Sequence, residues 1–274
     1  MTYRVTAQKF KGLKKLSSGA QDTSQWLTPT FSDEFSGGSL SPVWSMRGQD
    51  YEPSSKRKCS KGDPKAVKVT GGALRLSVIK DRSKKGKCLA KSRKTKKKIS
   101  YRLNGHVGTE GAFEFTHGFA AARIRLQPAR GQHGAFWMQT PGGAKPGGQK
   151  KGGAEIDVIE YFGDAHPQGG LTSYSYWLDK KGKQVRDGGW LPDADELGDD
   201  WSSEYHVFSV EWTPEGYVFR IDGQVSQRLN GETSGLSQFL VLSLLSSDYE
   251  LKQLDGDLPQ HMDVDWVRVW DTGD

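Results

Sequence analysis

The chain has 274 residues, with 39 Lys and Arg against 33 Asp and Glu and a formal net charge of +6. This length permits one large β domain or two average ones, and the lack of an 18-residue apolar run excludes a membrane-spanning helix. The 34 glycines, nine tryptophans and nine tyrosines favour a glycine-turned, aromatic-rich β protein over a helical one.

The first 28 residues differ from the rest because four lysines within residues 9–15 precede a Ser-Ser-Gly run. We predict that residues 1–28 are a linker or the end of an upstream module, and that residues 29–274 form the globular domain. The start has no apolar segment of the kind found in a signal peptide. We therefore expect either a cytoplasmic protein or, as the preferred alternative, a processed form of a secreted, extracellular one.

The globular part begins near Ser32, and its first clear pattern is a hairpin. Apolar residues alternate in 67–69 and again in 74–78, on either side of Gly71-Gly72. The most basic tract follows, since ten of the seventeen residues in 82–98 are Lys or Arg, and Lys56-Arg57-Lys58 precedes it. We expect exposed loops in both places.

The basic tract 82–98 has two interpretations. It is either a solubilising insertion at a sheet edge or a surface that attracts an anionic glycan or a cell-wall polymer. Its few aromatic residues argue against nucleic acid as a partner. The two cysteines, Cys59 and Cys88, bracket this region. In a secreted enzyme they could close a disulfide loop of about 30 residues, and two free thiols are the alternative.

Strand-like runs recur along the rest of the chain. An Asp222-Gly223 turn, typical of a two-residue hairpin, follows the alternating run 217–221. Many short strands without intervening helices predict an all-β sandwich of two antiparallel sheets. The predicted strands are 113–115, 120–126, 135–139, 155–162, 171–177, 206–212, 217–221, 239–245 and 264–270.

The run 155–160 places three carboxyl groups in an otherwise apolar strand. Side chains alternate faces along a strand, so Glu155 and Asp157 share a face while Glu160 should point the other way. A β-bulge at Val158 and Ile159 would return Glu160 to the face of the other two. Three carboxyls on one face repel and raise the proton affinity of at least one, as a glycosidase needs. The alternative is a solvated strand face with incidental acids.

The spacing Glu-x-Asp-x-x-Glu resembles the signature of glycoside hydrolase family 16, in the laminarinase-like form that carries the bulge residue. Six further segments resemble the family in order, so that the resemblance covers roughly residues 31–270. These segments are 33–35, 72–76, 122–126, 135–138, 210–214 and 264–270. The resemblance implies a β-jelly roll with a concave substrate cleft crossed by the catalytic strand.

The resemblance also implies catalytic roles. Glu155 would be the nucleophile, Glu160 the acid and then the base, and Asp157 an assisting residue that hydrogen-bonds to the nucleophile. With both glutamates on one face we expect their carboxyls to lie roughly 5 to 6 Å apart, a separation that predicts the retaining, double-displacement route. No cofactor is needed for this chemistry.

Sugar rings have apolar faces, so a saccharide cleft uses aromatic side chains together with a few polar groups. Trp137 matches the cleft tryptophan of the family. His206, Trp212, Tyr161 and Ser243 are further substrate-binding candidates, and Trp177 and His133 are weaker ones. For His206 the alternative is a half-buried structural histidine.

Family members often bind a structural calcium ion away from the cleft. Glu34, Gly72 and Asp265 fall at the positions that the resemblance assigns to its ligands, and oxygen ligands suit this cation. The residues alone do not predict the site.

Departures from the family limit the prediction of the substrate. Ala121 replaces an acid in the segment 117–123, and the segment 242–247 lacks the Asn and Gly of many laminarinases. The bulge residue argues against the branches with the shorter Glu-x-Asp-x-Glu form. We expect a monomeric, retaining endo-β-1,3-glucanase acting on a polysaccharide. The alternatives are a hydrolase of β-galactan, agar or carrageenan, a transglycosylase, and a non-catalytic glycan-binding protein.

Overall fold

The structure is a computed structural model that describes residues 28–52, 57–91, 96–191, 200–247 and 258–272. The predicted linker at residues 1–28 therefore lies outside the described residues, except for its last position. Within the described residues no helix is long and apolar enough to cross a membrane.

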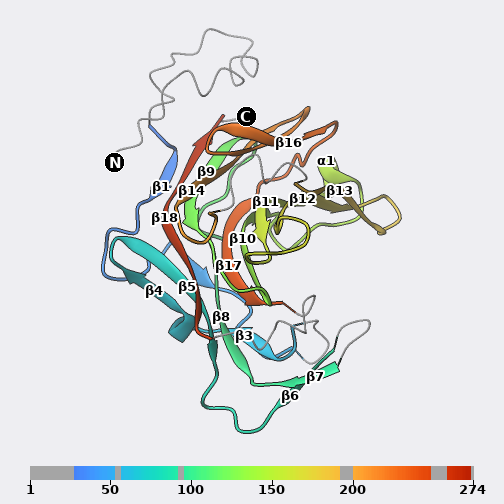
Figure 1. The fold of residues 1–274 in the computed structure, drawn as a ribbon. Coiled ribbons are helices and arrows are strands. Elements are labelled where there is room, and N and C mark those ends of the chain that lie inside the picture. The colour runs from blue at the N-terminus through green and yellow to red at the C-terminus, as the bar shows by residue number, and fades with distance from the viewer. Residues whose placement is uncertain (1–27, 53–56, 92–95, 192–199, 248–257, 273–274) are drawn as a thin grey trace.

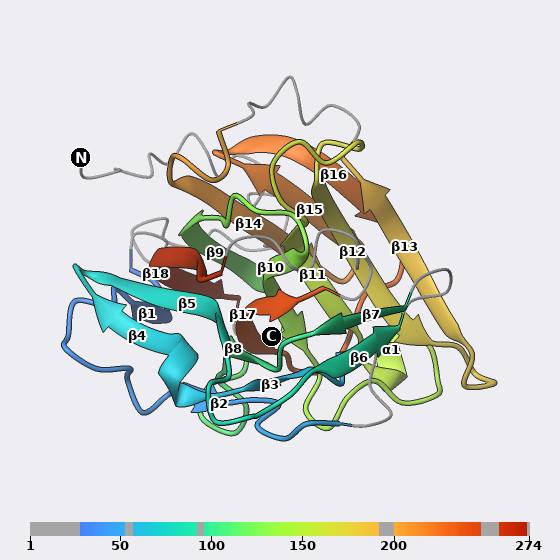
Figure 2. The ribbon, with the colours of Figure 1, turned by 60° about the horizontal axis from the view of Figure 1, so that its bottom comes forward.

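Hydrogen-bonded strands form two layers that face each other, and neighbouring strands within each layer are antiparallel (Figures 1 and 2). The inner layer, in order across the sheet, contains β13 (Gln184–Trp190), β12 (Leu171–Leu178), β11 (Glu155–Tyr161), β10 (Gln132–Gln139), β17 (Phe239–Ser246) and β8 (Arg102–Gly108). The outer layer contains β5 (Ala73–Lys80), β18 (Gln260–Asp271), β9 (Gly118–Arg125), β14 (His206–Thr213), β15 (Gly216–Ile221) and β16 (Gln224–Asn230).

Smaller elements lie at the edges of these layers. They are β1 (Phe31–Asp33), β2 (Ser45–Met46), β3 (Ser60–Gly62), a 3-10 turn (Pro64–Ala66), β4 (Val67–Thr70), β6 (Cys88–Lys91), β7 (Lys96–Ile99) and the short helix α1 (Gln149–Gly152). The predicted all-β sandwich is confirmed.

β8 joins the two layers because each of its halves pairs with a different one. Residues 102–104 pair with β5 of the outer layer, whereas residues 105–108 pair with β17 of the inner layer. Gly105 stands at the crossing, where a Cβ would lie 2.7 Å from Cβ of Leu76 and 2.8 Å from the carbonyl oxygen of Ala66. Only glycine lets the strand approach β5 this closely and turn from one layer into the other.

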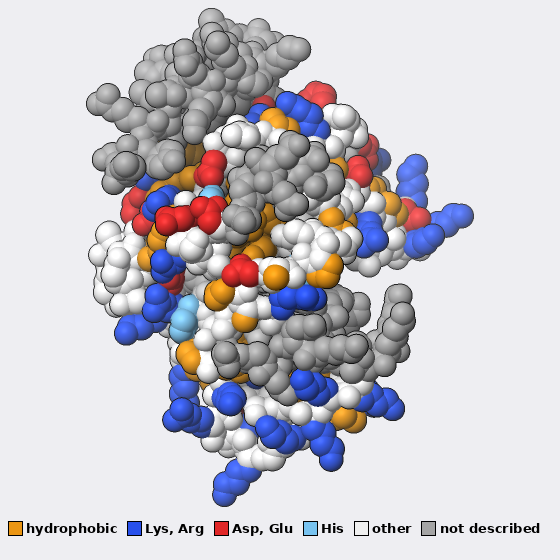
Figure 3. Space-filling model, in the orientation of Figure 1, with side chains coloured by type: hydrophobic (Ala, Val, Ile, Leu, Met, Phe, Trp, Pro, Cys, Tyr) orange, Lys and Arg blue, Asp and Glu red, His pale blue; other side chains and the backbone are white. Residues whose placement is uncertain are grey.

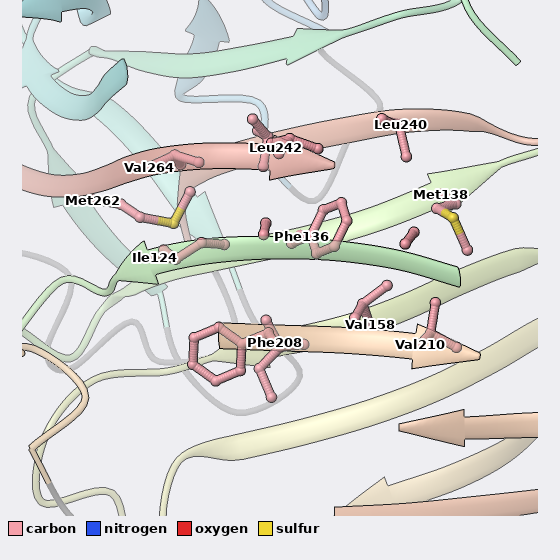
Figure 4. Close-up of a cluster of buried hydrophobic side chains, with 14 of the residues drawn as sticks. Ile124, Phe136, Met138, Val158, Phe208, Val210, Leu240, Leu242, Met262 and Val264 are labelled. Carbon is pink, nitrogen blue, oxygen red and sulfur yellow. The ribbon is translucent and has the colours of Figure 1, made fainter. Parts of the chain in front are cut away.

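The hydrophobic core fills the space between the layers (Figure 4). Alternate residues of the inner strands, such as Phe136, Ile156 and Leu242, meet alternate residues of the outer strands, such as Ile124 and Phe208. Side chains of successive residues point to opposite faces of a strand, so each inner strand presents its remaining residues on the side away from the core. That side of β11 carries the acids of the 155–160 run.

Two predicted hairpins are confirmed. β4 pairs with β5 around Gly71-Gly72, and β15 pairs with β16 around Asp222-Gly223, whose φ values are 49° and 82°. The predicted strand 113–115 is wrong, since only an isolated bridge joins Phe115 to Gln238 there.

The expectation of loops throughout the basic tract is also wrong. β6 and β7 pair as an antiparallel hairpin, here called the basic hairpin (residues 88–91 and 96–99), which projects at the bottom of Figure 1. Its inward side chains, Cys88, Ala90 and Ile99, form a small cluster with Cys59, and burial of these alternate positions explains the strands. Cys59 and Cys88 form a disulfide, as one of the two alternatives predicted.

Candidate active site

The 155–160 run forms all of β11 except its last residue, and it contains the predicted bulge. Asp157 pairs with Tyr174 and Glu160 with Thr172, so three steps on β11 correspond to two on β12. The same extra residue is present against β10, where Phe136 pairs with Ile159 and the next residue, Trp137, with Asp157. The hydroxyl of Ser173 donates a 2.9 Å hydrogen bond to the carbonyl of Val158, which satisfies the backbone at the bulge.

The bulge brings the three acids to one side of the inner layer, the side away from the core, here called the acidic face. Glu155, Asp157 and Glu160 lie opposite residues 139, 137 and 135 of β10, which are alternate positions and therefore share a face. Glu155 and Glu160 are half-buried, and Asp157 is only 5% exposed. Meanwhile Ile156, Val158 and Ile159 are buried in the core.

Glu155 has weak polar support. Its Oε2 accepts a 3.2 Å hydrogen bond from the side-chain amide of Gln139. The Gln139 oxygen in turn accepts a 3.2 Å bond from Arg47, whose guanidinium also pairs with Glu110 at 2.7 Å. Glu110 therefore balances the positive charge of Arg47, the arginine that lies behind Glu155.

Glu160 has closer polar neighbours, a hydroxyl donor and a histidine ring. Its Oε2 accepts a 2.8 Å hydrogen bond from the hydroxyl of Thr172, and its Oε1 lies 2.8 Å from Nε2 of His133. The other ring nitrogen of His133, Nδ1, lies 2.6 Å from the guanidinium of Arg57. Arg57 also donates a 2.7 Å bond to the carbonyl of Ser246.

These environments separate the proton affinities of the three acids. Burial, and then the charge of Glu160, raises the pKa of Glu155 to about 7. Burial and both glutamates raise the pKa of Asp157 well above its ordinary value. Burial alone would raise the pKa of Glu160 as well, but His133, Thr172 and Arg57 outweigh it and bring that pKa below its ordinary value. Before substrate arrives, Glu155 and Asp157 therefore hold protons more readily than Glu160 does.

Two predicted substrate-binding residues lie on the acidic face. Trp137 is half-buried opposite Asp157, and its indole stacks near His106 with ring centroids 6.1 Å apart. The indole nitrogen donates a 3.2 Å hydrogen bond to the hydroxyl of Ser243. Because Ser243 is 1% exposed, it holds Trp137 in place and does not itself present a surface to a ligand.

Three other predicted substrate-binding residues do not reach this face, which corrects that prediction. Trp212 is 0% exposed within the core, and Tyr161, 1% exposed, points inward and donates its hydroxyl to Asp164. His206 lies on β14 of the outer layer, where its Nδ1 is 2.8 Å from Asp222. Tyr161 points inward because it follows Glu160 on β11, whereas Trp212 and His206 belong to β14 of the outer layer. The position of His206 agrees with the structural alternative.

The two weaker candidates divide in the same way. His133 contacts Glu160 on the acidic face, whereas Trp177 packs against the core. Sequence reasoning missed Thr172, Tyr174 and Tyr176 on β12, which lie opposite Glu160, Asp157 and Glu155. Their alternation beside the acidic strand was a usable signal. For Arg57 and Gln139 there was none, because Arg57 lies in a basic run and Gln139 ends a largely apolar strand.

The residues proposed for calcium do not fit the ion as they are placed. Both oxygens of Glu34 accept 2.8 Å hydrogen bonds from Arg268, and Oδ2 of Asp265 pairs with Arg123 at 2.7 Å. A cation would have to displace two guanidinium groups. Among the described residues there is also no group of three His, Cys, Asp or Glu side chains arranged to hold a metal ion.

Comparison with known proteins agrees with this arrangement of acids. The family model described as glycosyl hydrolases family 16 matches residues 63–267. The chain belongs to glycosyl hydrolases family 16. The laminarinase catalytic domain of Thermotoga maritima has the same fold, with 21% identity, a TM-score of 0.66 and coverage of 90% of this chain and 99% of that one. The predicted β-jelly roll is thereby confirmed.

Two further members of the comparison show the range of activities that this fold supports. A glucan endo-1,3-beta-glucosidase of Cryptopygus antarcticus is 24% identical over 261 residues, which are 87% of this chain and 90% of that protein. A structure from the human gut microbiota, described among endo-acting O-glycanases that initiate mucin breakdown, is 18% identical with a TM-score of 0.68. It covers 90% of this chain and 91% of its own. Membership of family 16 therefore identifies a glycoside hydrolase.

Proposed function

We propose that this family 16 protein is a retaining endo-β-1,3-glucanase. The observation that carries the proposal is the bulge in β11, which puts Glu155, Asp157 and Glu160 on one exposed face of the sheet. Half-buried aromatic side chains lie opposite the acids on both neighbouring strands, at Trp137 and at Tyr174 and Tyr176. Such side chains suit the apolar faces of sugar rings.

In this proposal Glu155 attacks the anomeric carbon while Glu160 protonates the leaving oxygen. Water then releases the glycosyl-enzyme, with Glu160 taking a proton from it. The acids share protons as a coupled group, so one proton must pass to Glu160 when substrate binds and Glu155 ionises. Asp157, buried between them with a raised pKa, can give its own proton to Glu160 and take the one that Glu155 loses.

The β-1,3-glucan is proposed as substrate because the curated relative that aligns along most of the chain bears the name of a glucan endo-1,3-beta-glucosidase. The test is release of reducing ends from laminarin, mixed-linkage glucan, agar, carrageenan and mucin glycans. We expect fastest turnover of laminarin, with the β-anomer as the first product seen by NMR. Turnover of a galactan or of mucin glycans alone would reassign the substrate, and an α-anomer would refute the retaining route.

We also infer that the basic hairpin attracts an anionic polymer. Its outward face carries Lys91, Lys96 and Lys98 around the 38%-exposed Leu89, and no Asp or Glu occurs in residues 82–98. Figure 3 shows Lys and Arg side chains gathered over the lower part of the molecule, where Figure 1 places the hairpin. Charge of one sign concentrated on a protruding element favours such a partner.

Affinity electrophoresis in gels containing sulfated or neutral polysaccharide would test this inference. We expect retardation by the sulfated polymer that falls with salt and is lost when Lys91, Lys96 and Lys98 are changed to Glu. Changing the exposed Lys180, Lys181 and Lys183 to Glu at the β12–β13 turn, outside the basic hairpin, provides a control of equal charge. Equal loss in both triple variants would show that net charge alone is responsible.

We further propose that the protein is secreted. The Cys59–Cys88 disulfide supports this location, because such bonds persist mainly in oxidising compartments. Thiol alkylation of protein from the native host, followed by peptide mapping, would find both cysteines protected. Complete alkylation without reductant would contradict the proposal.

A further inference from the structure

His133 connects a catalytic acid to an arginine that is 76 residues away in sequence. Its Nδ1 lies 2.6 Å from the Arg57 guanidinium, and its Nε2 lies 2.8 Å from Oε1 of Glu160. A guanidinium has donors only, so Nδ1 must accept. A neutral imidazole that accepts through Nδ1 carries its hydrogen on Nε2, which faces Glu160.

The neutral state of His133 is consistent with its surroundings. The ring is 7% exposed, and it stacks on Phe162 with centroids 4.5 Å apart. Burial lowers the pKa of His133 first, the charge of Arg57 lowers it further, and Glu160 opposes both. His133 therefore acts as an uncharged donor whose tautomer is set by Arg57.

The position of Arg57 depends on the segment that carries the disulfide. The carbonyl of Arg57 accepts hydrogen bonds from the amide and the hydroxyl of Ser60, at 2.9 and 3.2 Å. Cys59 is tied to Cys88 of the basic hairpin, and its carbonyl accepts a 3.0 Å bond from the amide of Arg102. Figure 2 shows β3, which begins at Ser60, beside the hairpin. The segment that carries the disulfide thus also carries Arg57, whose side chain reaches His133 on the acidic face.

We propose that Arg57 and His133 are positioning residues for Glu160: Arg57 fixes the tautomer and orientation of the imidazole, whose Nε2–H holds the carboxylate and stabilises its negative charge. The inference rests on the proposed role of Glu160 as acid and base. When Glu160 gives its proton to the leaving oxygen it becomes a carboxylate, and His133 keeps its own proton throughout. Together with the Thr172 hydroxyl, the imidazole stabilises that carboxylate and so makes Glu160 a stronger acid.

Several other charged or titratable groups lie on or near the acidic face, so the test must separate their effects on Glu160 from those of Arg57 and His133. They are Glu155 and Asp157 on β11, His106 on β8, Tyr176 on β12, and Arg47, which lies behind Glu155. Burial lowers the pKa of His106 to about 3, helped by Arg47 and Arg57, so this histidine is neutral near pH 7. Arg47 provides a matched control because it is a second arginine near the same strand.

The first test measures the pKa of Glu160 directly, by NMR titration of carboxyl-labelled glutamate with Glu160→Gln to assign the signal. We expect Arg57→Met and His133→Phe to raise that pKa by about one unit or more. His133→Gln, which keeps a donor, should restore part of the difference, and Arg47→Met should leave Glu160 unchanged. An unmoved pKa in both Arg57→Met and His133→Phe, or an equal shift in Arg47→Met, would overturn the proposal.

The second test needs no variant. Nitrogen NMR of the wild-type histidines should show His133 with its hydrogen on Nε2. A hydrogen on Nδ1 would overturn the proposed positioning of Glu160 by Arg57 and His133. If the enzyme is active, the alkaline limb of its kcat profile should move to higher pH in Arg57→Met with little change in KM. Failure of wild-type protein to cleave any glucan would refute the proposed function, whereas the titration and the tautomer would still decide this inference.

Discussion

Glu155 and Glu160 lie on one strand, on one face, and yet have different electrostatic environments. Both are half-buried, and each meets a side chain from one end of β10: Gln139 beside Glu155 and His133 beside Glu160. The amide makes one long hydrogen bond of 3.2 Å, whereas the imidazole lies 2.8 Å from its carboxylate and Thr172 adds a second donor. Burial therefore raises the pKa of Glu155, whereas the polar and charged neighbours of Glu160 lower its pKa despite burial.

The arginines behind these side chains sharpen the difference. Arg47 is paired with Glu110, so its charge is largely balanced before it can act on Glu155. Arg57 instead contacts the His133 ring, which lies directly against Glu160, and it lowers the pKa of that carboxyl. The two arginines therefore reach their glutamates through different side chains, an amide at Glu155 and an imidazole at Glu160.

The largest expected effect comes from removing each glutamate. Glu155→Ala and Glu160→Ala should each lower kcat on laminarin by about 10³-fold or more, since each removes an essential participant. Azide added with an aryl glycoside bearing a good leaving group separates the roles. Glu160→Ala should give the β-glycosyl azide, formed from the glycosyl-enzyme, and Glu155→Ala the α-glycosyl azide. The opposite pair of products would exchange nucleophile and acid.

A smaller effect should follow from Thr172→Val, which removes one of the two donors to Glu160. A hydrogen bond to a charged group contributes ~1.5–3 kcal/mol, so we expect the pKa of Glu160 to rise by about one unit or more, with a roughly tenfold fall in kcat. The pH–rate profile measures both. Thr172→Ser keeps the hydroxyl and serves as the control. A Thr172→Ser profile displaced as far as that of Thr172→Val would show that packing, not the hydrogen bond, is responsible.

The contrast should also appear in stability as a function of pH. Burial raises the pKa of Glu155 to about 7, so the folded state favours the protonated form of this carboxyl. The stability that protonated Glu155 contributes is fully present below the unfolded pKa of about 4.3 and is lost as pH rises through 7. Glu160 has the opposite sign, because a lowered pKa adds stability above the unfolded value that is lost as pH falls.

Thermal unfolding of the two glutamine variants at pH 5 and pH 8 therefore gives a direct comparison. Relative to wild type, the Tm of Glu155→Gln should rise between these values, while Glu160→Gln should be the less stable variant at pH 8. Each kcal/mol corresponds to about 2–4 °C in a chain of this size. Parallel behaviour of the two variants would remove the claimed difference between the carboxyls.

The smallest effect is expected at Ser243, which contacts neither glutamate and holds the indole of Trp137. Ser243→Ala removes the hydrogen bond to the indole, and a net loss of ~1 kcal/mol predicts a KM about fivefold higher with kcat nearly unchanged. Initial rates on laminarin over a range of concentrations measure this. A fall in kcat at constant KM would instead place Ser243 in the chemistry of the acids.

Local patterns in the sequence were sufficient for the strands and for the bulge. Alternation and the acid spacing predicted β11, and parity alone required the extra residue at Val158 or Ile159. Long-range pairing was not accessible in this way. Parity on a single strand could not show that Trp212 faces the core or that His206 lies in the other layer, because that requires knowing which strands pair.

The same limit applies to the neighbours of the acids. Thr172 is in contact because β12 pairs with β11 in one register, and a signal for it existed in the alternation of residues 172–176. Arg57 had none, since a basic run next to a cysteine is typical of an exposed loop. Its contact with His133 depends on the disulfide and on β3, which pairs with β8 from a different part of the chain.

The bulge in β11 also affects how this strand tolerates changes in length. Removal of one residue from a regular strand turns every later side chain to the opposite face. Here, loss of Val158 would leave Glu, Asp and Glu at alternate positions, and an unbulged strand would still present all three on one side. A deletion that would invert a regular strand would leave the order and the facing of these acids unaltered. The position of Val158 is therefore one where β11 could lose a residue and still keep its three acids on one face.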